Sequence, residues 1–94
     1  MKSVENLTKG DHMAFGFNYN GGEPNEIIVD NITEIYEKDV LIHFVYGYKS
    51  LSESVKKEDI LAIGNSKGRG RIKGWTGSYD ILNQEKIDNI LNKK

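Results

Sequence analysis

Hydrophobic and polar residues alternate along much of the chain up to Gly64, which is the pattern of half-buried β-strands. In HMAFGFNY the large apolar side chains take every second position: Met13, Phe15, Phe17 and Tyr19. In VLIHFVYGY both parities carry apolar residues: Val40, Ile42, Phe44, Tyr46 and Tyr48 on one face, and Leu41 and Val45 beside His43 on the other. Apolar groups on both faces predict a central strand.

Three further segments are predicted as strands. The stretch EIIVDNITEIYE is rich in β-branched residues, but its apolar parity shifts around Asp30 and Asn31, which predicts a long bent strand with a bulge there. In KSLSESV, Leu51 and Val55 point inward while the serines face water. KKED then predicts one helical turn, and ILAIG a short buried strand that ends at Gly64. Glycines and Pro24 in NGGEPN interrupt the chain between the first two strands.

The period changes to that of a helix near the C-terminus. Asn83 is a suitable N-cap, and the apolar stripe of Ile87, Ile90 and Leu91 predicts a helix from about Gln84. The fold class is therefore mostly β: a small antiparallel barrel with a short C-terminal helix. We expect a single domain over residues 1–94, with a barrel core at 9–64, a basic glycine-rich segment at 65–79 and the helix at 83–92.

The order of these segments resembles a known class of small barrels. The stretch KGDHMAF, a glycine loop, then IIVDNITEIYEKDVLIHF and VKKEDILAIG are arranged as in SH3-like barrels of the Tudor and KOW kind. The resemblance covers roughly Lys9 to Gly64 and lies in the pattern of elements. It implies an SH3-like fold and a binding module, and it identifies no ligand.

Composition narrows the classes of function. With 94 residues and a formal net charge of −1, the chain has one small core and no overall positive charge to attract nucleic acid. It has no cysteine, which excludes disulfides, thiolate nucleophiles and cysteine-rich zinc sites. The N-terminus lacks the apolar region of a signal peptide, and no apolar run is long enough to span a bilayer. These features predict a cytoplasmic protein that makes no membrane contact.

One segment concentrates positive charge. In SKGRGRIKGWTGSY the basic residues fall on every second position, and Trp75 and Tyr79 continue this parity after Lys67, Arg69, Arg71 and Lys73. No acidic residue occurs from Ile60 to Tyr79, so this segment carries +4 against −5 for the rest of the chain. On an extended strand these side chains share one face at a spacing of about 6.6 Å, similar to that of successive phosphates in a nucleic-acid strand. The alternative is a solvated hairpin whose Trp75 closes the barrel.

Other chemistry has weaker support. His12 and His43 lack a partner at metal-ligand spacing; we expect His12 at the surface and His43 on a half-buried strand face. No nucleophile and base stand in a recognisable arrangement, and a barrel of this size has little room for a desolvated catalytic pocket. The aromatic residues belong mostly to the core, although Tyr19, Tyr46 and Tyr48 could extend a face toward a partner.

The sequence therefore predicts a non-enzymatic binding module without a cofactor. Its expected ligand is a nucleic acid, DNA or RNA, or another phosphate-rich partner. The residues expected to contact it are Lys67, Arg69, Arg71, Lys73, Trp75 and Tyr79. The alternative is a protein-interaction or inhibitor protein, encoded by a phage or mobile element, that binds a host protein through its acidic surface.

Overall fold

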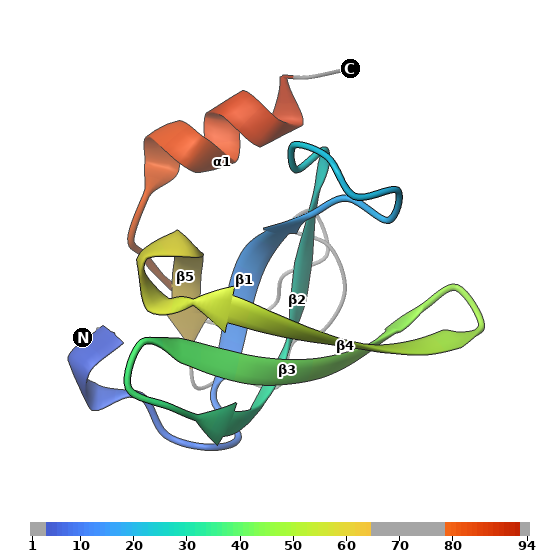
Figure 1. Ribbon diagram of the computed structural model, residues 1–94. Coiled ribbons are helices and arrows are strands. Elements are labelled where there is room, and N and C mark those ends of the chain that lie inside the picture. The colour runs from blue at the N-terminus through green and yellow to red at the C-terminus, as the bar shows by residue number, and fades with distance from the viewer. Residues whose placement is uncertain (1–3, 65–78, 93–94) are drawn as a thin grey trace.

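The computed structural model describes residues 4–64 and 79–92. Its strands are β1 (His12–Phe17), β2 (Glu26–Ile35), β3 (Asp39–Tyr46), β4 (Lys49–Lys56), β5 (Ile60–Gly64) and β6 (Tyr79–Ile81). A 3₁₀ turn, η1 (Val4–Asn6), precedes β1, and a second, η2 (Lys57–Asp59), joins β4 to β5. The helix α1 (Gln84–Leu91) follows β6 (Figure 1).

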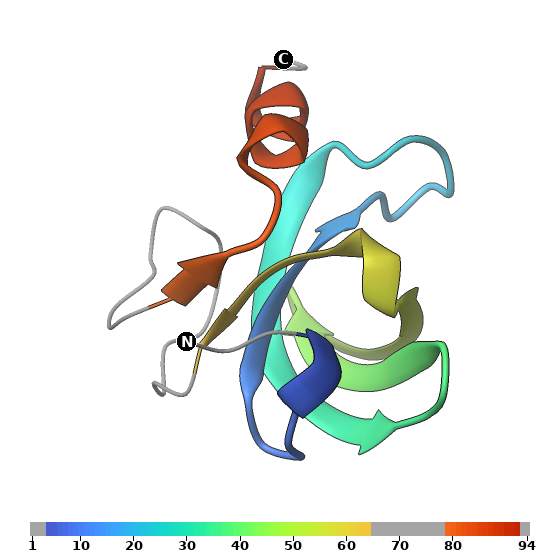
Figure 2. The same ribbon diagram turned by 90° about the vertical axis from the view of Figure 1, so that its left-hand side faces the viewer.

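The six strands form one antiparallel sheet in the order β4-β3-β2-β1-β5-β6. The sheet curls into a half-barrel because the long strand β2 pairs with β1 along its first part and with β3 along its second (Figure 2). The register between β2 and β3 shifts between Ile32 and Glu34. The predicted bulge is therefore present, about two residues later than the change in apolar parity indicates.

The interior of the half-barrel holds the larger apolar cluster. Its buried members are Met13, Phe15, Phe17, Ile28, Ile32, Val40, Ile42, Phe44, Val55, Ile60 and Ile63. The rings of Phe15, Phe17 and Phe44 meet edge to face, with centroids 5.2 to 6.3 Å apart. This geometry matches the electrostatic preference of aromatic rings. The alternation that predicted the strands therefore also identifies most of the core.

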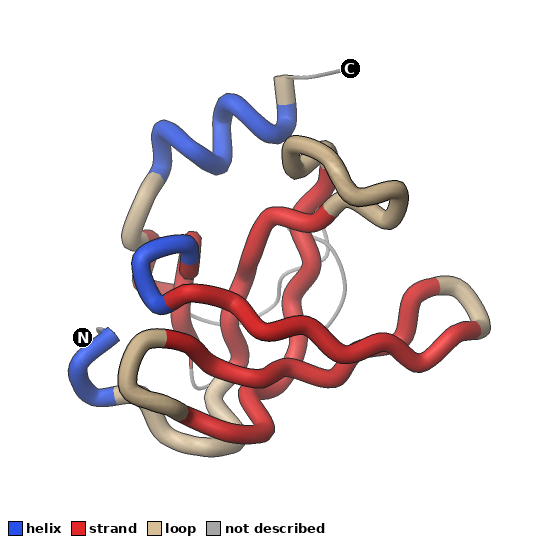
Figure 3. Tube along the Cα trace, in the orientation of Figure 1, coloured by secondary structure: helices blue, strands red, loops and turns tan. Residues whose placement is uncertain are grey.

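A second apolar cluster lies on the outer face of the sheet, under α1. It comprises Ala14, Ile27, Val29, Leu61, Ala62, Ile87 and Ile90. Ala14 of β1 pairs directly with Ala62 of β5, and these short side chains leave room for the helix to approach the sheet. The helix begins as predicted, because the Asn83 Oδ1 accepts a hydrogen bond from the Lys86 amide at 3.0 Å. Figure 3 shows α1 beside the loop that joins β1 to β2.

Three expectations about single residues are wrong. The strand predicted to run through Tyr48 ends at Tyr46, because Gly47 has φ +67° and the chain turns at Gly47 and Tyr48 into β4; Tyr48 is 96% exposed. The outer face of β3 is not buried, since Val45 is 67% exposed. His43 is exposed rather than half-buried.

His12 differs in the opposite sense. It was expected at the surface, but it is only 5% exposed, because β1 pairs with β2 on one side and with β5 on the other. Within the described residues, no helix combines the length and the apolarity needed to cross a membrane.

Candidate functional site

The predicted basic segment falls largely outside the described residues. Lys67, Arg69, Arg71, Lys73 and Trp75 belong to residues 65–78, and the structure describes the residues on either side. Gly64 at the end of β5 is the register partner of Tyr79 at the start of β6. Both ends of the connection 65–78 are therefore fixed side by side at one end of the sheet.

Tyr79 is the only predicted contact residue with a described position. It is half-buried and packs against the outer apolar cluster that α1 covers. Part of its ring therefore helps β6 to pack against the rest of the described structure. This burial leaves less of the ring available for stacking on a ligand than a fully exposed side chain would offer.

A row of four residues crosses the sheet where the connection begins. Asn31 of β2 pairs with His12 of β1, His12 with Gly64 of β5, and Gly64 with Tyr79. The Asn31 Oδ1 is buried and accepts no hydrogen bond from the described residues. Next to this row, Asp11 accepts hydrogen bonds from the Thr8 amide and hydroxyl at 3.0 and 3.2 Å, which fixes the turn into β1. The residues between which the connection 65–78 runs are therefore close to polar side chains and are held by pairing between several strands.

The described part of the protein is acidic. It contains all 14 acidic residues of the chain but only six of the 13 basic ones, which gives a formal charge of −8. Among the described residues, two of these six lysines form exposed ion pairs, Lys9 with Glu34 at 2.9 Å and Lys86 with Asp59 at 3.5 Å. The basic segment is therefore separated along the chain from the described residues, which carry a net negative charge and are called the body below.

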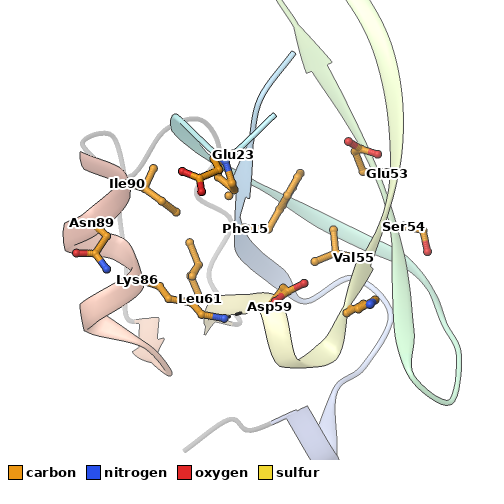
Figure 4. A pocket seen from close by; sticks show the side chains of 13 residues that line it. Phe15, Glu23, Glu53, Ser54, Val55, Asp59, Leu61, Lys86, Asn89 and Ile90 are labelled. Atoms are coloured by element: carbon orange, nitrogen blue, oxygen red, sulfur yellow. Dashed lines mark hydrogen bonds and ion pairs between the residues drawn. The ribbon is translucent and has the colours of Figure 1, made fainter. Parts of the chain in front are cut away.

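Two hollows lie along β4, and sequence reasoning did not find them. The larger, about 570 Å³, lies between β4 and α1. Its lining includes Phe15, Pro24, Val55, Leu61 and Ile90 (Figure 4). The smaller, about 260 Å³, continues toward the β3–β4 turn and is lined by Phe17, Tyr19, Leu51 and Ser52 among others. Glu53 borders both hollows.

The far end of the smaller hollow has an aromatic wall. The Tyr19 and Tyr46 rings stack with centroids 5.3 Å apart and planes 6° from parallel. The Lys49 Nζ donates a hydrogen bond to the Tyr19 hydroxyl and also lies 5.1 Å from the Tyr19 ring centroid. The Tyr46 hydroxyl donates to the Glu26 carboxylate. These contacts hold the Tyr19 ring in place although it is 45% exposed.

The hollows were missed because their lining comes from many separate elements. Phe15 and Gly16 belong to β1, Pro24 to the following loop, Leu61 to β5 and Ile90 to α1. No short motif links these positions. Gly16 lines the larger hollow, but a glycine within a strand indicates the close approach of another segment as readily as a hollow, so it did not mark the site.

The described residues hold no cluster typical of a metal site, since no three or more His, Cys, Asp or Glu side chains gather there. The His43 Nδ1 lies 2.5 Å from the Ser52 Oγ on the neighbouring strand, an exposed side-chain pair. Asp11 and His12 are adjacent in sequence, but the Asp11 carboxylate is used by Thr8.

Comparison of the chain with protein-family models, with curated proteins and with solved structures finds no match.

Proposed function

We propose that the protein is a non-enzymatic binding module that contacts a nucleic acid or another phosphate-rich ligand through its basic segment. The contacts are assigned to Lys67, Arg69, Arg71, Lys73 and Trp75. One observation carries the proposal: four basic residues and no acidic one lie between Gly64 and Tyr79, which are paired to each other, while every acidic residue lies elsewhere.

We also infer that the half-barrel is an SH3-like barrel of the Tudor and KOW kind. Support comes from the strand order β4-β3-β2-β1-β5, the bent β2 that serves both halves, and the 3₁₀ turn η2 immediately before β5. Such a fold is compatible with many ligands, so it supports a binding module without choosing a nucleic acid.

The charges determine how such a ligand would bind. Basic side chains that approach phosphates release condensed counterions, so affinity falls as salt is added. Trp75 would stack on an unpaired base, which favours single strands over duplexes. The body, with its formal charge of −8, repels phosphates and confines the contact to the segment.

The test is oligonucleotide binding by the full chain over a range of salt concentrations. In the double variant Arg69→Ala/Arg71→Ala we expect the log–log slope of affinity against salt to become shallower by up to about 2. The matched control, Lys38→Ala/Lys56→Ala, removes two exposed lysines of the body that lie outside the proposed contact, and should change the slope far less. Trp75→Ala should weaken binding of single strands more than of duplexes. Equal binding by the double arginine variant, or no binding by the wild type at low salt, would refute the proposal.

The second candidate is a protein-interaction or inhibitor protein, encoded by a phage or mobile element. The acidic body and the two hollows along β4 favour this function. The two candidates separate in a pull-down from the source cell after nuclease treatment. A nucleic-acid-binding module loses its co-purifying material, whereas an inhibitor keeps one protein at fixed stoichiometry.

A further inference from the structure

The outer edge of β4 has free main-chain positions. Among the described strands, β4 pairs with β3 alone, and it lies at the end of the sheet order. Its eight residues pair with β3 without any shift in register. Strand edges are commonly protected by bulges, prolines or a covering element, because an unprotected edge can pair with another chain. Within β4 the structure shows no bulge and the sequence no proline; the exposed lysines that discourage pairing, Lys49 and Lys56, stand only at its two ends.

The register identifies which groups point outward. The Lys57 amide donates to the Lys38 carbonyl at 2.9 Å, and this contact continues the β3–β4 pairing, in which Lys56 pairs with Asp39. In an antiparallel ladder hydrogen-bonded and non-hydrogen-bonded pairs alternate. The odd-numbered residues of β4 therefore bond to β3. The amides and carbonyls that face away from β3 belong to Ser50, Ser52, Ser54 and Lys56.

The two hollows lie beside these outward-facing groups. The residues of β4 that line them run from Leu51 to Lys56, a length of about 20 Å along a strand. Their far wall is formed by β1, the loop after it and α1. In Figure 4, Phe15 and Leu61 lie between α1 on one side and β4 on the other. A groove of this shape, next to free main-chain donors and acceptors, fits an extended chain better than a compact small molecule.

The charges of the groove indicate where a basic side chain of its occupant would lie. Glu53 borders both hollows, and Glu23 lies on the wall of the larger one. Asp59 is already paired with Lys86, and Lys56 brings positive charge to the end of β4 near η2. A basic side chain would be attracted to Glu53 in the middle of the groove.

We propose that an extended segment of a partner protein adds to the outer edge of β4 as a further strand. Its alternate apolar side chains enter the hollows against Phe15, Val55 and Ile90, and a lysine or arginine meets Glu53. Main-chain hydrogen bonds to Ser52, Ser54 and Lys56 contribute affinity, while the two hollows select the side chains. This site does not include the basic segment, so it stands whether or not that segment binds a nucleic acid.

The probe is a phage-displayed library of random dodecapeptides, selected against the full chain, with the selected peptides then synthesised. Peptides that bind should share alternating apolar residues and a basic residue. Amide hydrogen exchange measured by NMR should slow by about tenfold or more at Ser52, Ser54 and Lys56 when peptide is bound. The amides of Glu53 and Val55, which already bond to β3, should change far less.

Paired variants test the main-chain contact and the charge separately. Ser54→Pro removes an outward-facing amide that the β3–β4 ladder does not use, and should weaken peptide binding by about tenfold or more. Ser54→Ala keeps the amide and should bind like the wild type. Glu53→Lys should weaken the binding of peptides that carry a basic residue. Glu58→Lys, which makes the same charge change at an exposed residue of η2, should leave this binding unchanged.

Several results would overturn the proposal. The first is that no selected peptide slows amide exchange at the β4 edge. The second is that a folded Ser54→Pro variant binds the peptides as tightly as the wild type does. If circular dichroism shows that Ser54→Pro does not fold, two other measurements test the proposal: the amide exchange at the β4 edge, and peptide binding by Glu53→Lys compared with Glu58→Lys. Arg69→Ala/Arg71→Ala should bind the peptides normally, so a failure of nucleic-acid binding and a failure at β4 are separate results.

Discussion

Gly16 occupies a position on β1 where the structure leaves no room for a side chain. A Cβ placed there would lie 2.7 Å from the Pro24 Cβ and 2.9 Å from the Ile90 Cδ1. The Ile90 contact is with the end of a flexible side chain that can rotate. The Pro24 ring is rigid, so relief requires movement of the loop between β1 and β2. Gly16 thus allows this loop and α1 to pack against the same point of β1.

The expected cost of Gly16→Ala combines two opposing terms. Forcing an extra methyl group into a packed site costs about 1–3 kcal/mol. Alanine also restricts the unfolded chain, which stabilises the protein by about 0.4–1 kcal/mol where the backbone permits it. Gly16 is not among the glycines with positive φ, so the backbone adds no strain. The net destabilisation should be about 1–2 kcal/mol, or about 5–15 °C in Tm for a domain of this size.

Thermal unfolding followed by circular dichroism measures this effect. The matched control is Gly22→Ala, where a Cβ would approach only the Asn18 Nδ2, at 3.3 Å, on an exposed loop. We expect this control to change stability by less than about 0.5 kcal/mol. Ile90→Val deletes the Cδ1 atom and should make the cost of Gly16→Ala smaller than in the wild-type background. If Gly16→Ala melts no lower than Gly22→Ala, the loop and α1 do not meet at β1 as described.

Three further predictions follow from α1 and from the histidines. Ile87→Ala should destabilise the protein by about 2–5 kcal/mol, because Ile87 is 1% exposed under the helix, whereas Asn89→Ala on the exposed face should change urea unfolding little. Asn83→Ala should cost about 1 kcal/mol by removing the N-cap acceptor, and Asn83→Asp, which keeps an acceptor, should restore stability. Stoichiometric zinc should leave the Tm unchanged, because the described residues form no metal cluster; a rise of several degrees would contradict this.

The strands and the helix were predictable because their signals are local. Period-two alternation depends on residues that are close in sequence, and the inner cluster consists largely of the side chains that alternation selects. The helix boundary was predictable for a similar reason, since an N-cap acts within three residues. The short strand β6 was not predicted, because its three residues carry no periodic pattern and depend on pairing with β5.

The residues whose exposure was predicted wrongly depend on distant partners. The burial of His12 comes from strands on both sides of β1, and neither neighbour is evident from the residues around it. Val45 is apolar, yet the outer face of β3 has no helix over it, because α1 covers β1, β2 and β5 instead. A single sequence gives the apolar pattern of a strand but does not say which of its faces another element will cover.

The candidate sites differ in the same way. The basic segment was identified from composition, because charge can be counted without knowing the fold. The groove along β4 depends on topology: the outward direction of the Ser54 amide follows from the register with β3, and the far wall from the position of α1. A surface made by elements far apart in sequence is visible only after the elements have been placed.

The charge of the body affects what the salt dependence of nucleic-acid binding means. Four phosphate contacts alone would give a log–log slope of about −3.6 on duplex DNA. The described body carries −8 and repels the same phosphates, and salt screens this repulsion as well as the attraction. The two effects oppose each other, so the measured slope should be shallower than the number of basic residues implies. A shallow slope in the wild type is therefore not evidence against the segment; the difference between the wild type and the double arginine variant is the quantity that tests it, because the repulsion from the body is common to both.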